Sequence, residues 1–305
     1  MTVQSWMRNP WFSCVHRKDT TFFVSHKSPC LTFAGADAEM ARKIWEAAAF
    51  SASGESIAAL QDANGVDVET FSRIVKSMCE NDVFRLSAEA GMPVGDATSS
   101  AQMEFPCERL LVCISGAIEA SCIGQLLKVL RTHFCRDMRL VLTETASRLA
   151  SSEGLGYLLD CPVHTDPLSR EDVETGAPHI FLAQWASCVL VAPATAATIH
   201  RIAQGACNDL ISSIVMATPS ETPLVIAPSM NANMYGNAVL QRNLEACREC
   251  GYWVIEAGYG VEIAERVSEH ALSLGGLGCT EYTILPILRN LMNVSRATVS
   301  QPRQF

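Results

Sequence analysis

The stretch that decides the fold is Cys188-Val-Leu-Val-Ala-Pro-Ala-Thr-Ala-Ala-Thr198, in which an apolar run passes directly into a loop of small residues. The run Cys188–Ala192 predicts a strand buried on both faces, because such strands read as continuous apolar segments. The residues after the loop, from Thr198 to Met216, predict one long helix. A buried strand, a short loop and a helix together are typical of a βαβ unit.

The same alternation extends on both sides of this stretch. Further strands are predicted at Leu110–Ile114, Arg139–Leu142, Pro223–Ala227 and Tyr252–Glu256. Helices are predicted at Ala120–Thr132, from Thr145 to Ser151, and at Gly236–Cys250. Alternating strands and helices favour an α/β fold with a Rossmann-like (flavodoxin-like) parallel sheet. We assign this domain to residues 108–305.

The first 90 residues predict a small α+β domain of winged-helix type, joined to the α/β domain by a linker at 91–107. The predicted strands are Thr21–Ser25, Pro29–Phe33 and Val83–Leu86. Two helices are expected at Asp37–Phe50 and Ser56–Asp62, and a third begins after Asp67 as its N-cap.

The composition restricts the class of protein. With 49% hydrophobic and 18% charged residues, the chain reads as a soluble globular protein. Its net charge of −9 argues against nucleic acid as a partner. No apolar run reaches the roughly eighteen residues that a membrane helix needs, and the first residues contain no apolar signal core. We therefore expect a cytoplasmic protein without membrane contact.

The 13 cysteines are scattered, which favours reduced thiols over a disulfide framework. The one close pair, Cys247-Arg-Glu-Cys250, has the spacing of half a metal site or a redox pair. No second pair with ligand spacing follows it. The pattern favours ordinary thiols late in a helix, and no metal site is predicted.

Four loops follow the predicted strands and should meet at one edge of the sheet. The first, Ser115-Gly-Ala117, is either a phosphate-binding turn or an ordinary tight turn, and it lacks the GxGxxG pattern. The second, Thr143–Ser147, caps the next helix, binds a phosphate, or does both. The other two, 193–198 and 228–235, hold small polar residues, and Asn231 and Asn233 also suit a turn.

Two of these loops have sequences that resemble known motifs. Pro193-Ala-Thr-Ala-Ala-Thr198 and Pro228-Ser-Met-Asn-Ala-Asn-Met-Tyr235 resemble the signatures P-A-S-A-N-T and P-x-M-N-x-x-M-W of the homo-oligomeric flavin-containing cysteine decarboxylases. Upstream, Pro178-His-Ile and Gln184-Trp-Ala186 resemble the segment H-I-x-L-x-x-W-A of that family. The resemblance covers about Glu108 to Asn293.

The resemblance implies a flavin of the FMN type, with FAD as the alternative, bound between the subunits of a trimer or of a multiple of trimers. It makes His179 the catalytic acid or base and assigns Asn231 to the substrate carboxylate or carbonyl. The other histidines are interpreted as structural residues. The implied cofactor-binding residues are Ser115, Gly116, Ala117, Thr143, Thr145, Ala146, Pro193, Ala194, Thr195, Thr198 and Met230.

The resemblance also implies the chemistry. Decarboxylation of cysteine needs an electron sink, which arises when a flavin accepts hydride from the β-carbon; loss of CO2 then gives an enethiol. Phosphopantothenoylcysteine decarboxylases reduce this product with the help of a cysteine in an A-C-G-D-x-G-L-G segment. Here the comparable stretch is Ala271-Leu-Ser-Leu-Gly-Gly-Leu-Gly278, with Leu272 at the cysteine position and Cys279 close by. This favours a lanthipeptide-type enzyme that acts on the C-terminal cysteine of a precursor peptide and makes the enethiol of an aminovinyl-cysteine ring.

Three positions depart from the pattern. Ala197 replaces an asparagine that carries hydrogen bonds at the site, Asn208-Asp209 reverses the usual Asp-Asn order, and Tyr235 replaces tryptophan. These changes fit either a divergent subfamily or a non-catalytic scaffold that binds flavin or peptide. A small-molecule decarboxylase acting on phosphopantothenoylcysteine is the other alternative.

The amino-terminal domain resembles the PqqD-like precursor-peptide recognition module, through the pattern from Ala36 to Ile74. That module adds a leader peptide as a strand at a sheet edge. A structural or oligomerising appendage is the plainer alternative. DNA binding is disfavoured because Arg73 and Lys76 are offset by Asp67 and Glu69 on the expected third helix.

Overall fold

The computed structural model describes residues 6–8, 13–17, 20–24, 31–50, 68–81, 83–86, 105–167, 176–256, 259–261, 272–274 and 284–292. The chain divides into two compact units, residues 1–104 and 105–305, and each is described by itself. The division falls inside the predicted linker at 91–107, most of which lies outside the described residues.

The first unit is a small α+β unit. Its elements are β1 (Trp6–Arg8), β2 (Ser13–Arg17), β3 (Thr20–Val24), β4 (Leu31–Ala34), α1 (Ala36–Phe50), α3 (Val68–Glu80) and β5 (Phe84–Leu86). Strands β2, β3 and β4 form an antiparallel sheet, and β1 pairs with β5. The predicted helix Ser56–Asp62 and the N-cap Asp67 lie outside the described residues.

Two helices and the sheet of the first unit share one core. Phe23 lies edge-on to Phe33 and 5.4 Å from Trp45, measured between ring centroids. Ile44 and Ile74, from α1 and α3, are fully buried in the same cluster. The predicted helix Asp37–Phe50 and the predicted third helix therefore both pack into this core, but strands β1 and β2 were not predicted.

The second unit contains a parallel sheet. Its strands are β6 (Cys107–Ile114), β7 (Cys135–Leu142), β8 (Val163–His164), β9 (Cys188–Ala194), β10 (Leu224–Pro228) and β11 (Trp253–Ile255). They lie side by side in the order β11-β10-β9-β6-β7-β8, and every pairing among them is parallel. Numbered along the unit, this is the order 3-2-1-4-5-6 of Rossmann folds, so the predicted fold class is confirmed.

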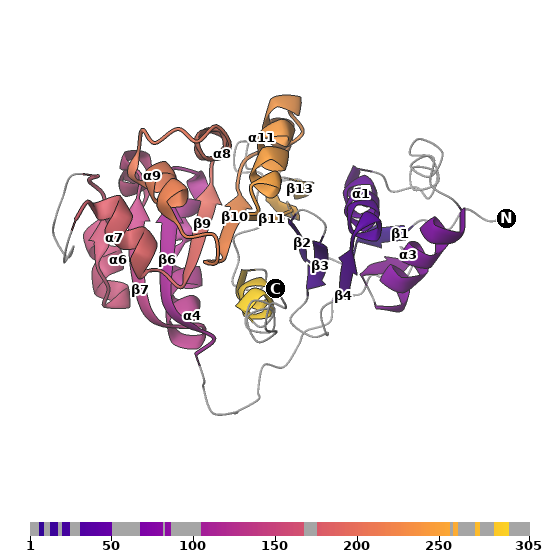
Figure 1. Ribbon diagram of the computed structural model, residues 1–305, viewed down its shortest axis with the longest axis horizontal. Helices are drawn as coiled ribbons and strands as arrows, with labels where there is room; N and C mark the ends of the chain where they lie inside the picture. The colour runs from indigo at the N-terminus through magenta and orange to yellow at the C-terminus, as the bar shows by residue number, and fades with distance from the viewer. Residues whose placement is uncertain are drawn as a thin grey trace, which may run out of the picture. The chain divides into compact units, whose positions relative to one another are not determined.

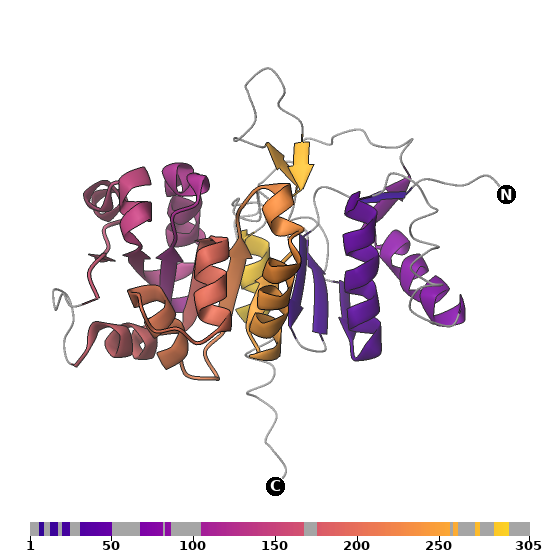
Figure 2. The ribbon, with the colours of Figure 1, turned by 90° about the horizontal axis from the view of Figure 1, so that it is seen from above.

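Helices cover both faces of this sheet. The helices are η2 (Ile118–Cys122), α4 (Gly124–His133), α5 (Glu144–Leu149), α6 (Ser152–Leu159), α7 (Pro178–Trp185), α8 (Ala196–Ala203), α9 (Leu210–Ala217), α10 (Ala232–Tyr235) and α11 (Ala238–Glu249). Figure 1 shows α8 and α11 on one side of the strands and α4 on the other. In Figure 2, the view from above, α11 lies over the strands of this unit. Helices α7, α8, α9 and α11 share a core with alternate residues of the strands.

The remaining elements of the second unit are short. Strand β12 (Tyr259–Val261) pairs antiparallel with β13 (Leu272–Leu274), and residues 284–292 are helical. Leu272 is thus the first residue of β13. No helix in the described ranges is long and apolar enough to cross a membrane.

The predicted long helix from Thr198 to Met216 is wrong. Helix α8 begins at Ala196, because Thr195 is its N-cap, and ends at Ala203. Gly205 then adopts a left-handed conformation with φ of 65°, which ends the helix. Asp209 starts α9 through a capping box with Ser212.

Two other predicted helices differ from the structure, one by an interruption and one by its bounds. The segment predicted as Ala120–Thr132 consists of the 3-10 turn η2 followed by α4. The segment predicted as Gly236–Cys250 is the helix α11, which begins only after Asn237, since the Asn237 side chain accepts a hydrogen bond from the Val239 amide.

The cysteines of the described ranges are free thiols. Cys247 is buried near the end of α11, and burial raises its pKa to about 12, whereas Cys250 is exposed. Burial also raises the pKa of the Cys113 thiol in β6, and nearby Asp209 adds to the effect. Among the described residues, no group of three or more His, Cys, Asp or Glu side chains could hold a metal ion.

Replacing Gly205 with alanine is expected to destabilise the second unit by about 1–2 kcal/mol, because a residue with a Cβ is strained at positive φ. The added Cβ would also lie 2.7 Å from Met216 Cε, a flexible end that can move. Gly156→Ala is the matched control: it is in the interior of α6, its Cβ would meet only ordinary contacts, and alanine favours helix by up to about 1 kcal/mol. Urea unfolding followed by circular dichroism measures both, and equal effects would contradict the prediction.

Candidate functional site

The candidate site lies where the order of the parallel sheet reverses, between β6 and β9. Ligands of open α/β sheets bind outside the carboxyl ends of the strands at this point. A cavity of about 710 Å³ is present there. Its lining residues are Ser115, Gly116, Leu142, Thr143, Glu144, Thr145, Thr165, Asp166, Pro167, Thr195, Ala197, Thr198, Arg201, Asn208, Asp209, Leu210 and Ile211.

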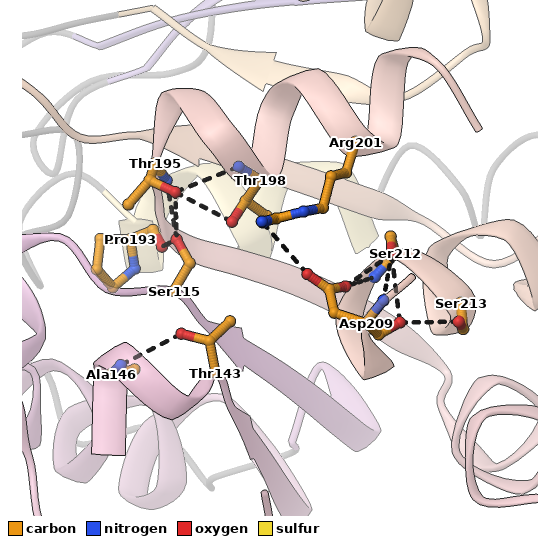
Figure 3. Close-up of polar contacts among 10 residues, drawn as sticks. All are labelled: Ser115, Thr143, Ala146, Pro193, Thr195, Thr198, Arg201, Asp209, Ser212 and Ser213. Atoms are coloured by element: carbon orange, nitrogen blue, oxygen red, sulfur yellow. Dashed lines mark hydrogen bonds and ion pairs between the residues drawn. The ribbon is translucent and has the colours of Figure 1, made fainter. Parts of the chain in front are cut away.

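Ser115 ties the first loop to the third. Its hydroxyl donates to the Pro193 carbonyl at 2.8 Å and accepts from the Thr195 amide at 2.8 Å (Figure 3). The Ser115 amide also donates to the Pro193 carbonyl, at 3.1 Å. Because Ser115 is buried, these bonds are shielded from water and hold the two loops in one fixed arrangement.

Gly116 lets the second loop approach the first. A Cβ at this position would lie 2.4 Å from Thr145 Cγ2 and 2.5 Å from Thr145 Cβ. Only glycine fits such a close approach. The close packing of the first and second loops therefore depends on the absence of a side chain at residue 116.

Two threonines of the cavity are helix caps. The Thr143 hydroxyl accepts from the Ala146 amide at 3.2 Å, and the Thr195 hydroxyl accepts from the Thr198 amide at 3.2 Å. The hydroxyls of Thr195 and Thr198 are also hydrogen-bonded to each other, at 3.1 Å. A hydroxyl that accepts still carries its own proton, so Thr143 can donate to an anion, and the Thr195 and Thr198 pair keeps one hydroxyl proton for the same purpose.

The cavity contains an ion pair that the sequence interpretation missed. Arg201 Nη1 lies 3.4 Å from Asp209 Oδ2, and Asp209 also accepts from the Ser212 amide at 2.7 Å (Figure 3). Arg201 is the one arginine or lysine among the described residues that line the cavity. The Asp209…Ser212 spacing is a capping signal that could have located this ion pair.

The predicted site residues fall into two groups. Six line the cavity: Ser115, Gly116, Thr143, Thr145, Thr195 and Thr198. Seven do not belong to its lining: Ala117, Ala146, Pro193, Ala194, Met230, His179 and Asn231. The first five of the second group are buried, so they contribute to the packing of the loops and not to the cavity surface.

His179 occupies the first turn of α7 and is half-buried. Two aromatic rings of this helix hold Arg139 of β7: the Arg139 Cζ lies 5.0 Å from the ring centroid of Phe181 and 5.0 Å from that of Trp185. A guanidinium stacked on two rings is attracted by both, which fixes α7 against strand β7.

Asn231 is the N-cap of the one-turn helix α10. Its Oδ1 accepts from the Met234 amide at 2.8 Å. The turn interpretation of Asn231 is therefore correct as local structure, and its side-chain amide group keeps two N–H donors for other partners.

Comparison with known proteins places this geometry in a family. The flavoprotein family model matches residues 98–272, which is more than half of the chain. The chain belongs to the flavoprotein family. The match includes all four loops that follow the strands of the sheet.

Curated relatives match the same part of the chain. The coenzyme A biosynthesis bifunctional protein CoaBC of Escherichia coli strain K12 is 36% identical over 149 residues, covering 49% of this chain and 36% of CoaBC. The probable phosphopantothenoylcysteine decarboxylase of Streptococcus mutans is 30% identical over 166 residues, covering 54% of this chain and 92% of that protein. This flavoprotein chain thus spans about a third of the length of its bifunctional relatives and nearly all of the shorter one.

Solved structures of flavoproteins are also similar. The epidermin biosynthesis protein EpiD from Staphylococcus aureus has a TM-score of 0.50 and 23% identity, covering 59% of this chain and 99% of EpiD. This likeness supports the fold. The FMN-dependent cysteine decarboxylase SpaF has a TM-score of 0.49 and 26% identity, covering 61% of this chain and 97% of SpaF.

The cavity of this flavoprotein fits a flavin nucleotide. Its volume is within the range of about 300–1,000 Å³ that is usual for cofactor sites. Its hydroxyl groups and the guanidinium of Arg201 are suitable donors for a phosphate.

Proposed function

We propose that this flavoprotein is a flavin-dependent decarboxylase of a cysteine-type substrate, with FMN as its cofactor. One observation carries the proposal: the cavity at the reversal of the sheet is built from the three loops whose sequences resemble the cofactor-binding motifs of such enzymes. Two relatives support the reaction class, since one is named a probable phosphopantothenoylcysteine decarboxylase and another an FMN-dependent cysteine decarboxylase.

Six residues of the cavity, Ser115 not among them, are proposed to hold the cofactor. Gly116 and Thr145 form the close approach of the first and second loops, and Thr143 supplies a hydroxyl donor. One hydroxyl of the Thr195 and Thr198 pair donates to the other, so this pair supplies one further donor. Ser115 acts differently, because its proton is already donated to the Pro193 carbonyl; it keeps the first and third loops together. The sixth, Arg201, which was not predicted from the sequence, supplies the positive charge.

A bound flavin supplies an acceptor for the two hydrogens that the substrate loses. Asn231 is proposed to orient the substrate carboxylate through its side-chain N–H donors. His179 is proposed to accept or return a proton at the substrate sulfur. Because neither residue lines the cavity of its own chain, we propose that a trimer brings them to the cavity of a neighbouring subunit.

The proposed substrate is the C-terminal cysteine of a ribosomally made precursor peptide, which would become an aminoenethiol. Leu272 supports this choice, because it occupies the position at which the enethiol-reducing enzymes carry a cysteine. The solved structure of an EpiD variant in complex with the substrate peptide DSYTC supports a peptide substrate as well. The amino-terminal unit is proposed to recognise the leader of that peptide, in the manner of PqqD-like modules.

The second candidate substrate is phosphopantothenoylcysteine. It is favoured by the relative from Streptococcus mutans, which this chain covers almost end to end and whose name carries that activity. A third candidate, a non-catalytic scaffold that binds flavin or peptide, is favoured by Ala197, an exposed residue of the cavity wall where an asparagine is usual in the motif.

One experiment separates these candidates. FMN-loaded protein is incubated with phosphopantothenoylcysteine and, separately, with peptides that end in cysteine or in serine. We expect the cysteine peptide alone to lose the mass of CO2 and two hydrogens. Mass loss only from phosphopantothenoylcysteine would move the assignment to the second candidate. A yellow protein that changes neither substrate would be the scaffold, and a protein that remains colourless after FMN reconstitution would refute the proposal.

A further inference from the structure

Asn231 belongs to a helical turn that is too short to be stable alone. Helix α10 has four residues, fewer than an isolated helix needs. The turn is closed by the Tyr235 amide, which donates to the Asn231 carbonyl at 2.9 Å. Met234 is exposed, whereas Tyr235 is 6% exposed and belongs to the core. The position of the turn is therefore decided by how Tyr235 is held.

The Tyr235 side chain ends at a buried carboxylate. Its hydroxyl donates to Glu256 Oε2 at 2.9 Å. Glu256 directly follows strand β11 and is 3% exposed. A hydrogen bond to a buried charged group is stronger than one between neutral groups, so it fixes the direction of the tyrosine ring.

Arg248 balances this carboxylate. The Arg248 side chain, which is 1% exposed, donates from Nη2 to Glu256 Oε1 and from Nη1 to Glu245 Oε2, the latter at 3.0 Å. A buried charge is tolerated only when it is paired and hydrogen-bonded. Removing the tyrosine hydroxyl takes one donor from Glu256 and leaves the ion pair in place.

Helix α11 makes a second contact that fixes Tyr235. Gln241 Nε2 donates to the Tyr235 carbonyl oxygen. Tyr235 is thus fixed at its side chain by the end of β11 and at its backbone by α11. These two attachments connect the Asn231 turn to the rigid part of the sheet.

We propose that Tyr235, anchored by Glu256 and Arg248, is a positioning residue that sets where the Asn231 side chain meets the substrate. This rests on the proposed role of Asn231 in substrate binding. The hydrogen bond to Glu256 depends on the tyrosine hydroxyl. The motif usually has a tryptophan at this position, and tryptophan carries one ring N–H and no hydroxyl at the far end of its ring.

The test compares Tyr235→Phe with the wild-type protein, both as the full, FMN-loaded chain. Without substrate, we expect amide hydrogen exchange in residues 231–236 to become about tenfold faster, while strand β6 and helix α4 stay unchanged. With the cysteine peptide, we expect KM to rise about tenfold and kcat to fall by less than about threefold. The affinity for FMN should not change, because Tyr235 is not part of the cavity lining.

Two further variants complete the design. Tyr252→Phe is the matched control, since the Tyr252 hydroxyl makes no hydrogen bond to the described residues; it should leave both readouts unchanged. Gln241→Ala removes only the second attachment and should loosen residues 231–236 to a smaller extent, which keeps the proposal testable if Tyr235→Phe does not fold.

Unchanged exchange in residues 231–236, or faster exchange throughout the second unit, would overturn the proposal. So would a KM equal to that of the wild type in a variant with loosened exchange. If wild-type protein turns over no substrate at all, the proposed function fails, and the exchange data still decide whether Tyr235 anchors the turn.

Discussion

Replacing His179 with asparagine is expected to lower turnover of the cysteine peptide by about two to four orders of magnitude while FMN stays bound. The reason is chemical: asparagine keeps a polar side chain of similar length but can neither accept nor release a proton near neutral pH. His179 is outside the cavity lining, so the cofactor contacts remain. The measurement is single-turnover mass loss of the peptide, together with the flavin absorbance of the purified variant.

His133→Asn is the matched control, since His133 is an exposed residue at the end of α4 and should tolerate the change. A variant that loses FMN together with activity would contradict the assigned role and point to a structural one. Mixing His179→Asn with Gly116→Ala, at an FMN concentration too low to load the Gly116 variant, tests whether neighbouring subunits share a site. Partial recovery of activity in the mixture is expected if His179 of one subunit serves the cavity of another.

Replacing Gly116 with alanine is expected to weaken FMN binding by about two orders of magnitude, since an error of about 1 Å in a preorganised site costs this much. The new Cβ would overlap Thr145 Cγ2 and Cβ, and a branched side chain fixed at its Cβ cannot move aside. The first and second loops must separate instead. Titration of the apoprotein with FMN, followed by quenching of flavin fluorescence, measures the change.

The overlap itself can be removed by a second substitution. Gly116→Ala combined with Thr145→Gly deletes both atoms that clash, so the double variant should bind FMN about as well as Thr145→Gly alone. Equal affinity of Gly116→Ala and wild type would show that the loops are not held as the structure describes. Failure of the double variant to recover would mean that the glycine is needed for a contact with the cofactor itself.

The strands of the sheet could be predicted from the sequence because burial on both faces leaves a continuous apolar run, as in Cys188–Ala192. The break in the predicted long helix could not, because apolar residues keep helical spacing through Ile211 and Ile214 on the far side of Gly205. Strand β8 has two residues, too few for any periodic pattern. In the first unit, β1 was missed for the same reason, because it has three residues. Strand β2 is as long as β3, but its sequence Ser-Cys-Val-His-Arg has little apolar character.

The candidate site, like the fold, could be predicted only in part. Residues such as Ser115, Thr143 and Thr195 could be found because they directly follow strands whose carboxyl ends must meet. Arg201 and Asp209 were missed as a consequence of the helix error: inside a continuous helix they read as surface residues, whereas the turn at Gly205 brings them together at the cavity. The different role of Ser115 depends on a contact with Pro193, 78 residues away, which no local pattern reveals.

The buried Cys113 has a consequence for the proposed activity, in which the substrate and the product are both thiols. Thiol–disulfide exchange requires a thiolate as the attacking group. Burial and the neighbouring Asp209 raise the pKa of the Cys113 thiol, so it stays protonated at neutral pH and does not attack. Among the described cysteines, thiol exchange is therefore expected at exposed thiols such as Cys122, Cys207 and Cys250 and not at Cys113.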